Sequence, residues 1–404
     1  MRYCPALLAA CILIPLSASA RGQDWAWNVA VSGGDIWLAS SGGGVPTFDY
    51  RIGASGAISE MRDVPDAYQR LLSPSYAGEA TDRIVQWTAW SNTVRYEATS
   101  LPDFEKRFNL TQGGNFAGTI SPTMAVEYNP AAGRLDVYSV PQDQWKTENA
   151  AAMQSKFSAL TRYEMLDQGV LAVRRVIRVG AVTLQGAPAT FDHLYIEGWS
   201  PFDRSSTTFN ALALGLDAAG NPNWWYRAGY NIPMYPGFDV DTQTNGYAVV
   251  YDEDAYASST AVGLVFGKRQ IVSDGSADKY EVNSMDWNNG IGILPGLTMY
   301  DVAEGSIIDQ TILLVPRRQL DAGMRDLLVS LVGQVPAPVL CAPGTTFTGE
   351  LAMIVSRLSG YVDASGQRTD HLGGMFTPVP EPASASLLVI GAVGMILRRR
   401  KRCR

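Results

Sequence analysis

Histidine and cysteine are scarce in this chain of 404 residues. The two histidines are His193 and His371, which argues against a zinc or copper site built from several imidazoles. The four cysteines are Cys4, Cys11, Cys341 and Cys403. Because the first two belong to an expected leader and the last to a basic tail, an exported body keeps only Cys341. No intramolecular disulfide is expected there.

Several nucleotide and hydrolase signatures are also missing. The glycines 42–44 are not followed by the lysine that a phosphate-binding loop requires, and no G-x-S-x-G motif occurs. The acidic pairs at 252–254 and 239/241 offer oxygen ligands for calcium, but they lack EF-hand spacing, and turn chemistry explains them equally well. We therefore expect no cofactor and no metal.

A long apolar run is lacking too. The run at 383–397 is about 15 residues, whereas a membrane-spanning helix needs roughly 20. Six cations follow it, which favours a cytoplasmic end and a body on the other side of the membrane. Residues 1–20 form an expected signal peptide that ends in Ala18-Ser19-Ala20, a cleavage signal. A lipoprotein signal at 8–11 is the weaker alternative, because the apolar run continues past Cys11.

The tail "VPEPAS" at 379–384, with its short apolar run and arginine-rich end, resembles the PEP-CTERM sorting signal. The resemblance implies recognition by an exosortase, contact with the membrane, and a place in the cell envelope linked to exopolysaccharide. It covers about 26 residues and gives an address rather than an activity.

Positive charge is scarce in the exported body. Without Arg2 and the six tail cations 25 basic residues remain, and without Glu381 38 acidic residues remain, a net charge near −13. Binding to phosphate backbones needs a cationic face, so we expect no nucleic-acid partner.

The body reads as β-structure. Short runs rich in Val, Ile, Thr, Tyr and Trp are separated by turn residues, for example at 83–90, 134–140, 170–184, 191–199, 247–251 and 262–266. No internal repeat is present, which argues against a propeller or β-helix. Helical spacing predicts a helix at 318–332 and a second, weaker one at 148–160. Residues 345–361 are compatible with a strand or a helix.

These observations predict an all-β protein, a large antiparallel sandwich with few short helices and a C-terminal membrane-targeting helix. The expected division is a signal peptide (1–20), a β-domain (21–335), its extension (336–362), a linker (363–380) and the sorting tail (381–404).

Three segments, "IGASGAISEMR" at 52–62, "FDHLYIEGW" at 191–199 and "GIGILPGLTMYDV" at 290–302, resemble in their order the galactose-mutarotase-like super-sandwich. That fold occurs in aldose epimerases and in domains of polysaccharide lyases and glycoside hydrolases. The resemblance implies that His193 is the catalytic histidine of a His-x-Tyr segment completed by Tyr195. The family's late catalytic glutamate is not matched, since 263–270 contains Lys268 and Arg269 instead.

The segment 191–199 is the main candidate site. As a strand, it places Asp192, Leu194 and Ile196 on one face. The other face carries an imidazole, a phenol, a carboxylate and an indole, from His193, Tyr195, Glu197 and Trp199. His193, Tyr195 and Glu197 are candidates for proton transfer and Trp199 for stacking on a sugar. A solvent-facing side chosen for cross-strand pairing remains the alternative interpretation.

Two other groups are candidates for substrate binding. Arg174 and Arg178 share a strand face opposite Arg175; they are suited to sugar carboxylates or, alternatively, to acidic residues on a neighbouring strand. The aromatic segment 221–238 offers Trp224, Trp225 and Tyr226 as a glycan-stacking rim, or as a small core over a sandwich edge.

The sequence thus predicts an exported, envelope-attached protein that binds or acts on extracellular polysaccharide or oligosaccharide. A non-catalytic surface or exopolysaccharide-matrix structural protein is the alternative.

Overall fold

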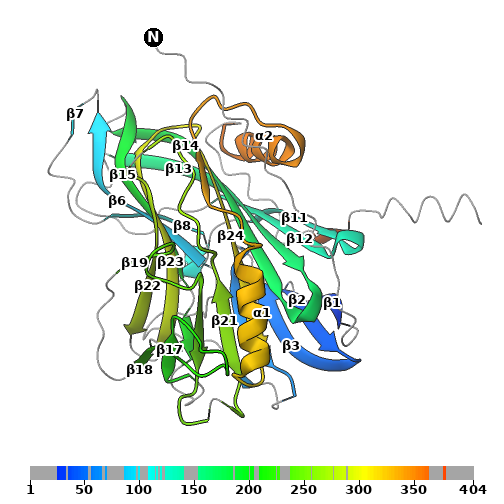
Figure 1. Ribbon diagram of the computed structural model, residues 1–404. Helices are drawn as coiled ribbons and strands as arrows, with labels where there is room; N and C mark the ends of the chain where they lie inside the picture. The colour runs from blue at the N-terminus through cyan, green and yellow to red at the C-terminus, as the bar shows by residue number, and fades with distance from the viewer. Residues whose placement is uncertain are drawn as a thin grey trace, which may run out of the picture.

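The computed structural model describes most of the exported body (Figure 1). The described residues are 25–32, 35–52, 56–65, 69–70, 86–96, 99–100, 108–113, 115–116, 119–120, 123–140, 153–184, 187–199, 201–203, 209–223, 225–227, 237–255, 257–275, 277–287, 290–363 and 376–378. The predicted signal peptide and the whole of the predicted sorting tail, with its expected helix, lie outside them. Among the described helices, none has the length and apolar character needed to cross a membrane.

A large sheet, here the β14 sheet, forms one layer of the body. Its strands pair antiparallel, except that β26 runs parallel to β11. In spatial order they are β26 (Phe376–Pro378), β11 (Thr123–Asn129), β12 (Arg134–Ser139), β13 (Met153–Met165), β14 (Leu171–Leu184), β24 (Ile307–Arg317), β21 (Ala261–Val265), β20 (Tyr247–Tyr251), β17 (Ala211–Ala213) and β18 (Trp225–Arg227), with β25 (Val339–Cys341) beside β24.

A second sheet, the β15 sheet, forms the facing layer and is joined to the first through the β14–β15 hairpin. All its pairings are antiparallel. Its order is β8 (Phe108–Gly113), β6 (Gln86–Tyr96), β15 (Ala187–Trp199), β23 (Gly290–Val302), β22 (Lys279–Trp287) and β19 (Phe238–Asp239), with β7 (Thr99–Ser100) beside β6 and β16 (Pro201–Asp203) beside β23.

An N-terminal sheet packs against one end of the sandwich (Figure 1). The indole of Trp27 donates a hydrogen bond to the carbonyl of Leu166 at 2.9 Å, and the hydroxyl of Tyr163 donates to the carbonyl of Gly56. The strands are β1 (Trp25–Ser32), β2 (Asp35–Gly42), β3 (Val45–Ile52), β4 (Ile58–Asp63) and β5 (Gln69–Arg70); the short pair β9 (Asn115–Phe116) and β10 (Thr119–Ile120) and the 3-10 turns Pro130–Ala132 and Asp167–Gly169 complete the β-body.

Alternating side chains explain how the layers meet. On β14, Val173 and Ile177 point between the sheets, where they join the same buried core as Leu194 and Ile196 of β15. The predicted all-β sandwich is therefore confirmed, since burial of one apolar face from each sheet drives the layers together.

Two helices cover the outer face of the β14 sheet. Helix α1 (Ala322–Val332) begins at the cap residue Asp321, whose carboxylate accepts from the Met324 amide at 2.8 Å. The first predicted helix is thus present but starts later than residue 318. Helix α2 (Gly349–Asp363) occupies the segment that the sequence left open, and its Ile354 and Leu358 pack on the sheet.

The second predicted helix, at 148–160, is wrong for its described part. Residues from Met153 onward form strand β13. Phe157 faces the interior of the sandwich, while Leu160 lies under α2. Because apolar residues occur on both faces of this strand, the sequence lacks the alternation of a half-buried strand and imitates helical spacing.

Candidate functional site

Strand β15 carries the predicted site, and its outward residues lie as expected. Leu194 and Ile196 are buried in the core, while His193 and Tyr195 are half-buried on the outer face. Phe191, rather than Asp192, joins the core because the register against β6 shifts around His193. This β-bulge reverses which side chains at the start of the strand face the core, and it leaves the imidazole on the outer face.

Tyr195 is held by the neighbouring strands. Its hydroxyl accepts a hydrogen bond from Asn283 Nδ2 on β22 at 2.6 Å. To reach it, the phenol crosses Gly296 of β23, where an added Cβ would lie 2.8 Å from the Tyr195 Cζ atom. A side chain at 296 would displace the ring, so this glycine is required for the phenol's position.

His193 lies beside Tyr300. The two residues are register partners on β15 and β23, and their rings are tilted at 31° with centroids 5.3 Å apart. Tyr300 is 41 % exposed and its backbone N–H donates to the Asp278 carboxylate at 2.9 Å. An imidazole and two phenols therefore form one aromatic face that solvent reaches.

A carboxylate and an amide border this aromatic face. Glu281 and Asn283 alternate with the buried Tyr280 and Val282 along β22, and their side chains pack over Gly237, where an added Cβ would lie 3.2 Å from Glu281 Oε2. We call the set His193, Tyr195, Glu281, Asn283 and Tyr300 the outer cluster. Sequence reasoning missed its β22 and β23 members, although the alternating pattern "KYEVN" at 279–283 marks Glu281 and Asn283 as outward residues.

Burial lowers the pKa of the His193 imidazole below its ordinary value of about 6.5, because desolvation disfavours the charged form. The ring is therefore neutral at pH 7 and is able to accept a proton. The unfolded chain takes up the proton first as the pH falls. The stability that the neutral ring contributes is thus present above about pH 6.5 and is lost as the pH falls toward the lowered value.

This shift is measurable by NMR, because the chain has only two imidazoles. We expect the His193 resonance of the full-length protein to titrate with a pKa below about 6.5. A His371→Gln variant assigns the two signals and serves as the control. A midpoint for His193 at or above the ordinary value would contradict the desolvated position.

For the other predicted acidic and aromatic site residues, the structure describes the backbone at most. Glu197 and Trp199 belong to β15, but their side chains lie outside the described part. Trp224 lies outside it entirely. Trp225 and Tyr226 form part of β18 in the β14 sheet, and their side chains are likewise outside it. Their predicted roles remain predictions.

Arg174 and Arg178 lie on the β14 sheet. Arg174 binds Asp309 of β24 in bidentate fashion, with Nε and Nη2 at 2.9 and 2.6 Å from the two carboxylate oxygens. Of the two interpretations given for this arginine, the structure has the second: Arg174 pairs with an acidic residue of the next strand. Arg178 is on the same strand, half-buried, and pairs in register with Ile307.

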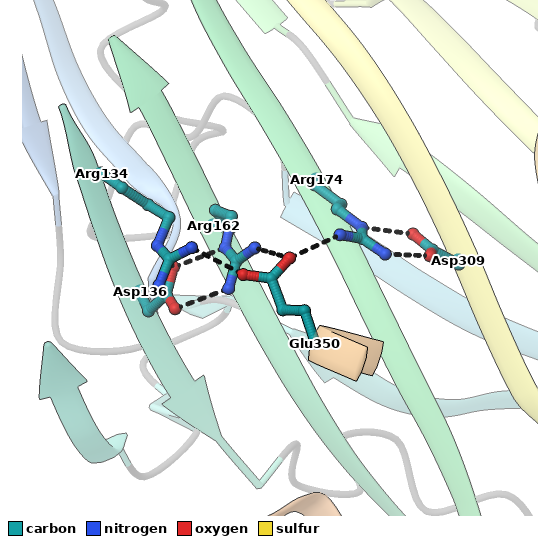
Figure 2. A network of polar contacts seen from close by, with 6 residues as sticks. All are labelled: Arg134, Asp136, Arg162, Arg174, Asp309 and Glu350. Atoms are coloured by element: carbon teal, nitrogen blue, oxygen red, sulfur yellow. Dashed lines mark hydrogen bonds and ion pairs between the residues drawn. The ribbon is translucent and has the colours of Figure 1, made fainter. Parts of the chain in front are cut away.

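Arg174 belongs to an ionic network under helix α2 (Figure 2). Arg162 donates to both carboxylate oxygens of Asp136, at 2.7 and 2.9 Å, and its Nη1 lies 2.8 Å from Glu350 Oε2. Arg134 donates to the other Glu350 oxygen at 2.6 Å. Figure 2 shows the Glu350 side chain extending from the helix, with its carboxylate between Arg162 and Arg174.

The network keeps the Glu350 carboxylate ionised. Burial raises the pKa of Glu350, but the hydrogen bond and charge of Arg162 and the charges of Arg134 and Arg174 outweigh it, so the pKa lies below its ordinary value. Three arginines and three carboxylates balance in charge and fasten α2 to the sheet.

No group of three or more His, Cys, Asp or Glu side chains suited to a metal ion occurs among the described residues. The acidic turn at 252–254 instead bonds internally, with Asp252 Oδ1 accepting from the Asp254 amide and from Asn210 Nδ2, both at 3.1 Å.

Comparison with protein-family models agrees with the resemblance of the tail. Residues 378–401 match the PEP-CTERM protein-sorting motif, which indicates export and sorting at the membrane through the C-terminus. No curated protein matches.

Similar solved structures include a galactose mutarotase-like protein from Clostridium acetobutylicum, with 11% identity, a TM-score of 0.41, and coverage of 73% of this chain and 99% of that one. An aldose epimerase homologue from C. elegans shows 9% identity, a TM-score of 0.38, and coverage of 73% and 100%. Galactose 1-epimerase from Lactobacillus acidophilus shows 8% identity, a TM-score of 0.39, and coverage of 74% and 100%. The chain thus carries a PEP-CTERM sorting motif, and the solved structures similar to it include a galactose mutarotase-like protein and aldose epimerases.

Proposed function

We propose that this protein is attached to the cell envelope and binds extracellular polysaccharide on the outer face of the β15 sheet. One observation carries the proposal: the Tyr195–Asn283 hydrogen bond and the His193–Tyr300 ring contact assemble aromatic and polar groups on one partly exposed face. Aromatic planes pack against the C–H faces of sugars, and a phenol, an amide and a carboxylate bond their hydroxyls.

The charge of this face favours a neutral sugar. Glu281 contributes a carboxylate to the outer cluster, and Lys279, exposed on the same strand, is the nearby cation. Arg174, which the sequence suggested for sugar carboxylates, is committed to Asp309. Among the described side chains of this face, an acidic glycan would therefore meet a carboxylate and a lysine but no guanidinium.

The same cluster supplies the groups for proton transfer. The neutral His193 is suited to act as a base and the Tyr195 phenol as an acid, if a sugar ring oxygen or C–H group lies within hydrogen-bond reach of both. Catalysis is the second step of the proposal, and the assay below tests it separately from binding.

Calorimetry with a panel of neutral and acidic polysaccharides tests binding. We expect a neutral polysaccharide to bind, and expect His193→Ala and Tyr195→Phe each to weaken it about tenfold, which corresponds to about 1.4 kcal/mol. Lys268→Ala, an exposed position in the bend that follows β21, is the control and should bind normally. Equal binding by all variants would contradict the assigned face.

The same mixtures, assayed for new reducing ends, altered anomers or unsaturated products, separate a binding protein from an enzyme. Loss of product formation in His193→Ala would assign the catalytic role. Failure of every polysaccharide to bind would instead support the alternative of a structural surface protein.

A further inference from the structure

Arg175 is a buried cation in the centre of the sandwich. It follows Arg174 on β14 but points to the opposite side, between the sheets, where it is 1 % exposed. Its Nη2 donates to Gln310 Oε1 of β24 at 2.5 Å. Among the residues that the structure describes, no carboxylate forms an ion pair with it, in contrast to Arg174 on the outer face.

The polar groups around Arg175 also offer more hydrogen-bond donors than acceptors. Arg175 Nε and Nη1 and the Tyr280 hydroxyl proton are buried and have no acceptor in the described structure. Gln310 Nε2 is directed at the Tyr280 oxygen and lowers the pKa of that phenol against the effect of burial. Guanidinium and amide nitrogens only donate, and a hydroxyl is also able to donate. The cluster therefore contains several donors and a positive charge, and the acceptor that the guanidinium contacts, Gln310 Oε1, is already used.

The charge persists at neutral pH. Burial lowers the pKa of Arg175 to about 10, while the phenols of Tyr280 and Tyr163 act in the opposite direction. A guanidinium with this pKa remains protonated at pH 7. A buried charge without a counter-charge is strongly unfavourable, and proteins meet this situation with a partner of opposite sign.

We propose that Arg175, Gln310 and Tyr280 bind a small monovalent anion, with chloride as the simplest occupant, between the two sheets. The depth of the cluster selects the size of the ligand: Tyr280 and Tyr163 are fully buried and Gln310 is 4 % exposed. Such an interior position suits a halide rather than a sugar. An anion there accepts hydrogen bonds from the donors and neutralises the guanidinium.

The anion site lies directly behind the outer cluster. Gly198 of β15 approaches the guanidinium so closely that an added Cβ would lie 2.9 Å from Arg175 Nη2. Tyr280 immediately precedes Glu281 on β22. The bound anion thus ties the strands that carry His193 and Glu281 to the β14 sheet, and the inference does not depend on what the outer cluster binds.

The test is the thermal unfolding midpoint of the full-length protein at fixed ionic strength, with chloride or bromide compared with the bulkier methanesulfonate. Ligand linkage predicts that a halide at about 100 times its dissociation constant raises the midpoint by about 4 °C. The two halides should act alike. Equal midpoints in all three salts would overturn the proposal, and would instead point to water as the partner of these donors.

Two variants localise the effect. Arg175→Met removes the cation and should abolish the halide response. Gln310→Glu places a fixed carboxylate beside the guanidinium. It should therefore raise the unfolding midpoint in methanesulfonate and abolish the response to halide. This variant keeps the test decisive if Arg175→Met does not fold. Arg174→Met, on the opposite face of the same strand, is the matched control and should keep the wild-type shift. A full halide response in Gln310→Glu would overturn the assignment.

Discussion

Asp136→Asn is expected to lower the free energy of unfolding by about 3 kcal/mol, because it leaves the buried Arg162 with part of its charge unpaired. Arg162 is 1 % exposed and donates to both oxygens of Asp136. Asparagine has nearly the same shape but lacks the charge, so packing is preserved and the electrostatic loss is isolated. Urea unfolding monitored by circular dichroism measures the difference.

The control for this prediction is the pair formed by Glu127 and Arg357, which is more exposed. Glu127→Gln should cost less than about 1 kcal/mol, as is usual for solvent-exposed ion pairs. If Asp136→Asn cost no more than Glu127→Gln, the buried Arg162 would not depend on the charge of Asp136 as the network of Figure 2 implies.

Gly296→Val is expected to leave the protein folded and to reduce polysaccharide affinity by at least about tenfold, equivalent to about 1.4 kcal/mol. The new side chain occupies the space crossed by the Tyr195 ring and separates the phenol from Asn283. Valine suits a β-strand, so the backbone tolerates it. Calorimetric titration gives the affinity, and a thermal melt confirms folding.

Gly333→Ala is the matched control, since an added Cβ at 333 meets nothing within 4 Å. Combining Gly296→Val with Tyr195→Ala should add little to the loss from Tyr195→Ala alone, because both changes remove the same phenol contact. Wild-type affinity in Gly296→Val would contradict the role of Tyr195 in the outer cluster.

Local patterns made much of the β-structure predictable. The predicted strand at 247–251 coincides with β20, and the predicted face with His193 and Tyr195 is the outer face of β15. These succeed because alternation along one strand fixes which side chains share a side. Strand β13 was not predictable in this way, since α2 buries its second face and removes the alternation.

Contacts between strands distant in sequence were less predictable. The sequence separated Arg174 from Arg175 by face, but the partners Asp309 and Gln310 come from β24, more than a hundred residues later. In the same way, Asn283 and Tyr300 join Tyr195 and His193 only through the order β15–β23–β22. Strand order is a property of the whole fold, so one strand's pattern does not contain it.

The His193 imidazole provides the most direct test of the proposed carbohydrate site. NMR spectra of the full-length protein, recorded during titration with oligosaccharide fragments of a bound polysaccharide, report on its two imidazoles separately. The proposal predicts that the His193 signal shifts or broadens in proportion to occupancy, while the His371 signal stays unchanged. Saturating binding with an unchanged His193 signal would contradict a site on the outer face of the β15 sheet.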